Sequence, residues 1–125
     1  PRIKSAPKIR QLYWCDFPQD AQLPEFWKRR PVVILSYRNT LSGTVTVIPC
    51  STAPQIGNAW AVEISTTISA DKSWAICDKP CTVAVSRLVK DHRGIPRLPE
   101  EEFDRVVSKT LEWLPAPKDL QKQES

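Results

Sequence analysis

The sequence predicts a mainly β fold: a small, strongly curved barrel of five to six strands, followed by one C-terminal helix. Three observations predict this fold. Short runs of β-branched and aromatic residues follow one another closely along the chain. The composition has 12 prolines and only 3 glycines, which is typical of stiff connections between short elements. An amphipathic pattern with helical spacing occurs near the C-terminus, between residues 99 and 115.

The first three strands are predicted from β-forming residues. Leu12 to Phe17 combines alternation with aromatic side chains, and Pro31 to Tyr37 is a compact β-branched run. Thr44 to Cys50 alternates Thr with Val before Pro49. Asn39 to Gly43 carries the residues expected in a turn, so the second and third strands are predicted to form an antiparallel hairpin.

Three shorter strands are predicted after this hairpin, at residues 60–64, 73–77 and 82–88. Trp60, Val62 and Ile64 share one face of the first of these strands. The turn-forming residues 78–80 separate the other two strands.

The predicted helix follows Pro99, which suits a first-turn position, and Pro115 ends it. Three glutamates at positions 100–102 lie where they interact favourably with the positive helix start. Its apolar face is expected to comprise Phe103, Val106, Val107, Thr110, Leu111 and Leu114. A helix of about 15 residues can cover one side of a barrel.

The length of 125 residues suits one domain with a real core. We expect this domain at residues 9–115, with a basic arm at 1–8 and a flexible tail at 116–125. The chain has neither a long apolar run nor a signal-peptide core, so a cytoplasmic location without membrane contact is expected. Because the chain does not begin with Met, we interpret its start as trimmed or fragmentary.

The formal charge of +4 is compatible with an anionic partner but does not require one. The four cysteines have spacings that argue weakly for disulfides or zinc. We expect them to be reduced and mostly buried, and we expect no metal or other cofactor.

Two of the predicted strands carry groups suited to an RNA phosphate. Arg30 immediately precedes the second strand, and Ser51 and Thr52 follow the third. A guanidinium offers a planar, permanently charged fork of donors, and a hydroxyl beside it can donate or accept one more hydrogen bond. The alternative is that Ser51 and Thr52 only end a strand with a side-chain-to-backbone hydrogen bond.

An ordered set of motifs carries a family resemblance: residues 14–17 (WCDF), Glu25, residues 30–36 (RPVVILS) and residues 47–52 (VIPCST). With these motifs, the chain resembles the MazF/PemK family of toxin–antitoxin endoribonucleases over roughly residues 9–114. The resemblance implies an SH3-like barrel, similar to that of CcdB-like toxins. It implies metal-independent cleavage of single-stranded mRNA by attack of a 2′-hydroxyl on the adjacent phosphate. It also implies a homodimer and a cognate antitoxin, with DNA contacted only through that antitoxin.

The resemblance implies catalytic roles for Arg30 and Ser51. The family usually has Thr where this chain has Ser51, and Thr52 can share its role. Glu25 aligns with the acidic residue of the family's Gly-Ser-Glu loop, although Leu and Pro replace Gly and Ser here. Glu25 would hold Arg30 or accept a proton. The alternative is a surface carboxylate paired with Lys28.

The candidate RNA-binding residues are Lys28, Arg29, Trp27 and Asp16. The alternative for Arg29 is a solvated neighbour of Arg30, and Trp27 could instead contact an antitoxin. His92 is a candidate for proton transfer, although a lone histidine in a loop is more often simply exposed.

Two other functions stay open. One is a toxin of the same fold that binds a protein target without cutting RNA, and the other is a nucleic-acid-binding SH3-like module.

Overall fold

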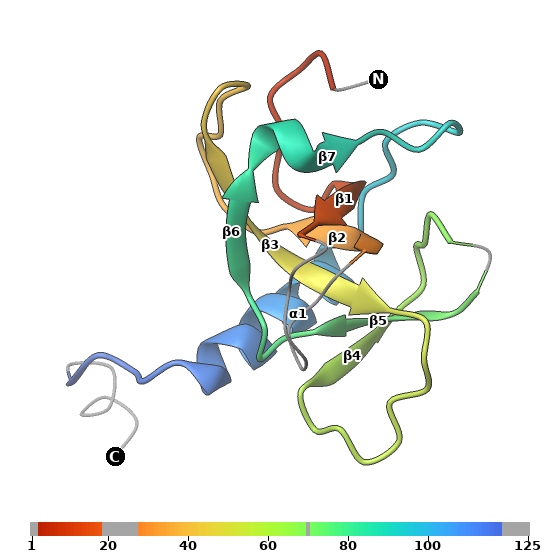
Figure 1. The fold of residues 1–125 in the computed structure, drawn as a ribbon. Coiled ribbons are helices and arrows are strands. Elements are labelled where there is room, and N and C mark those ends of the chain that lie inside the picture. Colours follow the sequence, from red (N-terminus) through yellow and green to blue (C-terminus); the bar gives the residue numbers. More distant parts are fainter. Residues whose placement is uncertain (1–2, 19–27, 70, 119–125) are drawn as a thin grey trace.

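The computed structural model describes residues 3–18, 28–69 and 71–118 and contains one curled β-sheet with a helix packed on it (Figure 1). The elements are β1 (Leu12–Phe17), β2 (Lys28–Ile34), β3 (Thr44–Ser51), β4 (Ala61–Ile64), β5 (Ser73–Ile76), β6 (Cys81–Ala84), the 3₁₀ turn η1 (Val85–Arg87), β7 (Leu88–Val89) and α1 (Glu100–Trp113).

Strand β3 is the centre of the sheet. The main path runs β4-β5-β3-β2-β1-β7, and β6 also pairs with β3. Val47 of β3 lies opposite Ile34 of β2 on one side and Cys81 of β6 on the other. Farther along β3, Cys50 lies opposite Ala75 of β5. All of these pairings are antiparallel, including the predicted β2–β3 hairpin.

The connection between β6 and β7 curls the sheet. Strand β6 pairs with β3 and β7 with β1, yet only the 3 residues of η1 separate them in the chain. The two edges must therefore approach each other, and the ring β6-β3-β2-β1-β7 takes the shape of the predicted small barrel. The mainly β fold with a C-terminal helix is confirmed. The described residues form seven strands, because η1 divides the run at 82–88 that was predicted as one strand.

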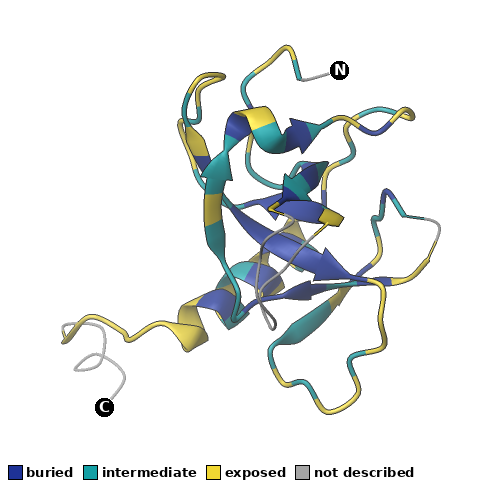
Figure 2. Ribbon diagram, in the orientation of Figure 1, coloured by how far each residue is buried: buried dark blue, intermediate teal, exposed yellow. Residues whose placement is uncertain are grey.

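The curled sheet separates two hydrophobic cores, one on each of its faces. The inner core lies within the curl and comprises Tyr13, Cys15, Phe17, Val32, Ile34, Val45, Val47, Val85 and Leu88. The outer core lies under α1, β4 and β5 and comprises Leu12, Val33, Ile48, Cys50, Ile64, Ile68, Ala75, Cys77, Leu98, Phe103 and Val106. Strand β2 contributes to both cores, which explains its uninterrupted run of apolar residues. Figure 2 shows this burial continuing along the central strands.

Helix α1 begins after Pro99, as predicted, and covers the outer core. Phe103, Val106 and Thr110 are its buried residues. The prediction was wrong for Leu111 and Leu114, which are 61% and 47% exposed. In the last turn of the helix, the buried Thr110 and the Trp113 ring, which packs edge-on against Trp60 with the ring centroids 5.3 Å apart, face the sheet, whereas Leu111 faces solvent. Figure 2 shows the C-terminal end of the helix as largely exposed. The described part of the chain contains no helix with both the length and the apolar character needed to cross a bilayer.

The four cysteines are free thiols, and Cys15, Cys50 and Cys77 are buried, as expected. Burial raises the pKa of the Cys15 thiol to about 12 and that of Cys77 to about 11. These thiols are protonated at neutral pH, so they behave as core side chains and not as nucleophiles.

The difference in burial between Leu98 and Leu111 predicts different outcomes for the same Leu→Ala substitution. Leu98→Ala removes a fully buried side chain from the outer core and should lower the free energy of unfolding by about 2–5 kcal/mol. Leu111→Ala changes a side chain that is mostly exposed and should stay within about 0.5 kcal/mol of the parent protein. Urea denaturation followed by tryptophan fluorescence measures both. Equal losses of stability would contradict the description of Leu98 as a core residue and Leu111 as a solvent-facing one.

Candidate active site

Arg30 and Ser51 lie at the same end of the β2–β3 ladder. Arg30 is near the start of β2, and Ser51 is the last residue of β3. Val32 lies opposite Pro49 in the observed register. The observed pairs between β2 and β3 end there, and the same antiparallel register continued by one step of alternation would set Arg30 of β2 opposite Ser51 of β3.

Both residues share the face of the inner core. Arg30 pairs with Cys15 of β1, whose side chain belongs to that core. Ser51 is separated from the inner-core residue Val47 by two steps of strand alternation. The guanidinium and the hydroxyl are thus brought to the rim of the curl, where Arg30 is half-buried and Ser51 is 8% exposed.

The Ser51 hydroxyl already takes part in local structure. Its Oγ accepts a hydrogen bond of 3.1 Å from the backbone N–H of Ala53. This is the strand-ending bond named above as the alternative role for Ser51. A hydroxyl that accepts one bond still has its own hydrogen to donate, so both roles are compatible. Thr52, the neighbouring candidate, is exposed beyond the end of β3.

Arg29 and Asp16 form a cross-strand ion pair near Arg30. They are opposite each other in the β1–β2 register, and Arg29 donates bonds of 2.7 and 3.2 Å to the two carboxylate oxygens. The hydrogen bond from Arg29 to Asp16 raises the pKa of the guanidinium. Both side chains remain partly exposed, so this pair contributes at most about 1 kcal/mol to stability. It orders the strand end beside Arg30.

Arg87 also belongs to this rim, and sequence reasoning missed it. Its guanidinium donates a 3.0 Å hydrogen bond to the backbone oxygen of Asp16. The residue lies in η1, and the two bonded residues are 71 positions apart in the chain. Local pattern gave no signal for it, because residues 82–88 were interpreted as a single strand.

Lys28 enters β2 with a left-handed backbone, φ 65°. Residues other than glycine seldom adopt this conformation, and it persists only where the surroundings impose it. One end of β1 and β2 thus holds four cationic residues and the carboxylate of Asp16. The four cations are Lys28, Arg29, Arg30 and Arg87. This arrangement makes the rim basic. Glu25 and Trp27 lie outside the described residues.

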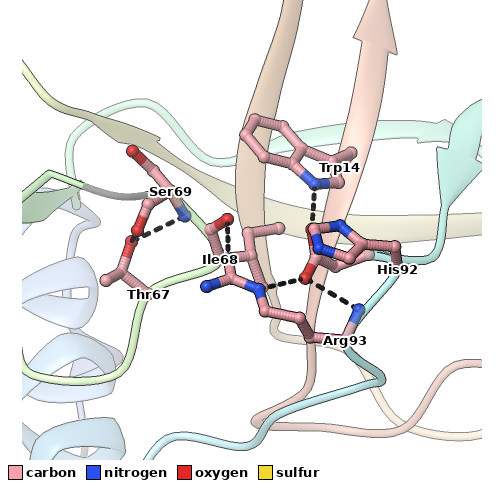
Figure 3. A network of polar contacts seen from close by, with 7 residues as sticks. Trp14, Thr67, Ile68, Ser69, His92 and Arg93 are labelled. Carbon is pink, nitrogen blue, oxygen red and sulfur yellow. Dashed lines mark hydrogen bonds and ion pairs between the residues drawn. The ribbon is translucent and has the colours of Figure 1, made fainter.

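His92 belongs to a different polar network, centred on the buried carboxylate of Asp91 (Figure 3). Trp14 Nε1 donates to Asp91 Oδ1 at 3.0 Å, and Arg93 donates to Oδ2 through its backbone N–H and its Nε. Arg93 also donates to the backbone oxygen of Ile68 at 2.6 Å. The network fastens β1, the 91–94 turn and the segment preceding β5 to one another.

The structure does not bring His92 to Arg30 and Ser51. The His92 side chain is 85% exposed, and its Nδ1 lies 3.6 Å from Asp91 Oδ1. Asp91 is held by Trp14, which packs on the outer core, whereas Arg30 shares the face of the inner core. The candidate site for proton transfer is thus separate from the candidate phosphate site.

The fold defines a class of protein, the small curled β-barrels with a C-terminal helix. The structure is similar to crystal structures of MazF from Deinococcus radiodurans, with a TM-score of 0.72 and 19% identity over 89% of this chain and 98% of that chain. It is also similar to the toxin MazF-mt6 of Mycobacterium tuberculosis, with a TM-score of 0.59 and 22% identity over 81% of this chain and 93% of that one.

A structure of a MazE–MazF complex from D. radiodurans is similar as well, with a TM-score of 0.66 and 16% identity over 91% of this chain and 100% of that chain. No curated protein matches in sequence. A family model described as "PemK-like, MazF-like toxin of type II toxin-antitoxin system" matches residues 8–114. The chain therefore belongs to the PemK/MazF family of toxins of type II toxin–antitoxin systems.

The Asp91 network predicts a specific acid sensitivity. The hydrogen bond from Trp14, together with those from Arg93, lowers the pKa of Asp91 from 3.8 to about 2. A carboxyl group with a depressed pKa stabilises the fold above its unfolded pKa, and the stabilisation is lost as the pH falls from about 4 towards 2. The stability difference between parent and Asp91→Asn should stay constant from about pH 7 to pH 5 and shrink below about pH 4.

Urea midpoints of both proteins, measured across this pH range, test the assignment. Using the difference between the two proteins removes the titration of all other carboxyl groups. A difference as large at about pH 2 as at neutral pH would show that Asp91 does not titrate as its surroundings require.

Proposed function

We propose that this toxin is a metal-independent endoribonuclease that cleaves single-stranded mRNA. The proposal is supported by the register of β2 and β3, which, continued by one step of alternation past Val32 and Pro49, would put Arg30 and Ser51 on one face at one end of these strands. A fixed guanidinium and a hydroxyl next to each other suit a phosphate on which charge develops. Family membership supports the same chemistry.

The proposed reaction uses a nucleophile that RNA itself supplies. The 2′-oxygen attacks the adjacent phosphorus and loses its proton, the bond from phosphorus to the 5′-oxygen breaks, and that oxygen gains a proton. The products are a 2′,3′-cyclic phosphate and a 5′-hydroxyl. No water needs to be activated, so the reaction does not require the metal ions of a two-metal nuclease.

Arg30 stabilises the charge that grows on the phosphate oxygens. Its planar fork can bind two of these oxygens at once, which a lysine ammonium cannot do. Ser51 donates its remaining hydroxyl hydrogen to the phosphate, with Thr52 next to it. Glu25 keeps the role that the family resemblance implies, holding Arg30 or accepting the 2′-hydroxyl proton.

The basic rim is the proposed path for the RNA backbone. Lys28, Arg29 and Arg87 flank Arg30 at the same end of the sheet. Cationic side chains near the phosphates supply affinity that does not depend on sequence. Trp27 would add base stacking, and the Arg29–Asp16 pair would position the cation beside the strand.

The proposed protein partners are a second copy of the chain and a cognate antitoxin. Neighbours of the same fold include a MazE–MazF complex from D. radiodurans. An acidic antitoxin segment would compete with RNA for the cations of the rim. A symmetric dimer would carry two copies of the Arg30 site.

Cleavage assays in chelator test the proposal directly. Arg30→Ala should lower kcat by about 10²–10³-fold because a preorganised donor to the transition state is lost, and Arg30→Lys should restore only part of the activity. Ser51→Ala should lower kcat, whereas Ser51→Thr should keep it because the hydroxyl is retained. Arg105→Ala, an exposed cation on α1, is the matched control and should be fully active.

End-group analysis of the products decides among the alternatives. A 2′,3′-cyclic phosphate that disappears with Arg30→Ala supports the nuclease. Intact RNA that is nevertheless retarded in a gel would point to a binding module. Intact, unbound RNA with growth arrest on expression would point to a toxin with a protein target.

A further inference from the structure

A second basic groove lies at the other end of β2 from Arg30. It is a cavity of about 360 Å³, formed by residues 6–9 of the N-terminal segment, residues 36–39 after β2, and Arg97. Lys8, Arg38 and Arg97 line it together with Tyr37. From Arg30 to Ser36 the distance is about 20 Å at roughly 3.3 Å per residue of extended chain.

The groove carries positive charge without compensation. Its lining contains three cationic residues and no carboxylate. Within the described residues, none of these three side chains forms an ion pair, and the nearby Glu100 is bonded to Arg10 at 3.4 Å. An uncompensated cluster of this kind attracts anions to the site.

The walls of the groove are held in place by hydrogen bonds. Asn39 Nδ2 donates to the backbone oxygens of Pro7 and Ser36, at 3.0 and 2.8 Å. Ser36 Oγ donates to Asn39 Oδ1 at 2.8 Å and accepts from the Thr46 N–H at 3.0 Å. The N-terminal segment is thereby fastened to the β2–β3 connection, at the same end of the molecule (Figure 1). The cations are thus presented from preorganised backbone.

Two further features indicate the class of ligand. Tyr37 is 76% exposed, so its ring is available at the edge of the groove. Arg38 has a left-handed backbone, φ 56°, a conformation that tends to occur where function requires it. Cations that follow a backbone, combined with an exposed aromatic ring for a base, are the combination found in proteins that bind single-stranded nucleic acids. An acidic polypeptide would use the cations but would have no need of the ring.

We propose that this groove binds the sugar–phosphate backbone of single-stranded RNA, several nucleotides away from the bond that is cut, with Tyr37 stacking on one base. The inference rests on the proposed function, which makes RNA the substrate. It assigns Lys8, Arg38 and Arg97 to binding affinity for long RNA and not to the chemical step.

The test compares RNA binding by the parent protein and a charge variant, Lys8→Gln/Arg38→Asn/Arg97→Gln. Asn is used at position 38 because it tolerates the left-handed backbone. The control, Lys72→Gln/Arg105→Gln/Lys118→Gln, removes the same charge from exposed positions elsewhere. The probes are 2′-O-methyl RNAs of about 20 and about 5 nucleotides, which lack the nucleophile, and binding is followed by fluorescence anisotropy over a range of salt.

The charge variant should bind the long RNA at least tenfold more weakly at low salt. The slope of log K against log salt should fall by about 2, since each lost phosphate contact removes about 0.7 for a single strand. The short RNA, the control variant and kcat at saturating RNA should be unchanged. Tyr37→Leu should weaken binding of the long RNA at least fivefold, whereas Tyr37→Phe, which keeps the ring, should not. Equal urea midpoints verify that the variants are folded.

Different failures have different signatures. If the charge variant binds the long RNA with the affinity and salt slope of the parent protein, the groove does not bind RNA and the proposal is wrong, whether or not the protein cleaves RNA. If the parent protein does not cleave RNA but still binds the long RNA through the groove, the proposed nuclease activity is wrong and the RNA-binding role of the groove is supported. If the charge variant loses binding of poly-L-glutamate while RNA binding is unchanged, the groove is a site for acidic polypeptide and the proposal is wrong.

Discussion

The ladder between β2 and β3 is the constraint on which the rest of the structure depends. Strand β2 is covered on both faces, with Val32 and Ile34 in the inner core and Val33 in the outer core. A shift of one residue in its register would exchange the two sets of side chains and move Arg30 to the opposite face. Burial on both sides therefore fixes the position of a polar residue that is itself only half-buried. The stability of the core and the geometry of the candidate site have one cause.

The same logic accounts for the placement of charge. The inner core fills the curl, so side chains on the inner face of β1, β2 and β3 can reach solvent only at the ends of the strands. One end carries Arg30, Ser51 and the Arg29–Asp16 pair, and the other carries the groove of Lys8, Arg38 and Arg97. The Asp91 network is separate from both ends, because its bonds to Trp14 and Arg93 join β1 to the 91–94 turn on the outer face. Its role is to hold the fold together.

Much of this architecture could be predicted from local pattern. Alternation predicted β1 with its observed bounds and β3, β4 and β5 to within a residue, and helical spacing between two prolines predicted α1 to within two residues. The run at 82–88 was predicted as one strand, but the structure interrupts it with η1. Val85 and Leu88 are both buried, and this spacing of three residues suits a 3₁₀ turn better than a strand. Strand β2 begins at Lys28 and not at Pro31, because pairing with β1 overrides the low strand propensity of charged residues. For the candidate site, the sequence motifs pointed to Arg30 and Ser51. They could not point to Arg87, because its hydrogen bond to Asp16 joins segments that are far apart in the chain and no local sequence pattern indicates it.

The central claim is that Arg30 and Ser51 act on one phosphate. A crystal structure of the protein with an RNA that carries a 2′-deoxy nucleotide at the cleavage position tests it most directly, since such an RNA binds but cannot react. We expect the phosphate next to that nucleotide to lie within about 2.7–3.2 Å of both the Arg30 guanidinium and the Ser51 Oγ. A bound RNA whose phosphate contacts neither residue, or an Arg30 side chain turned away from Ser51 in the complex, would contradict the account.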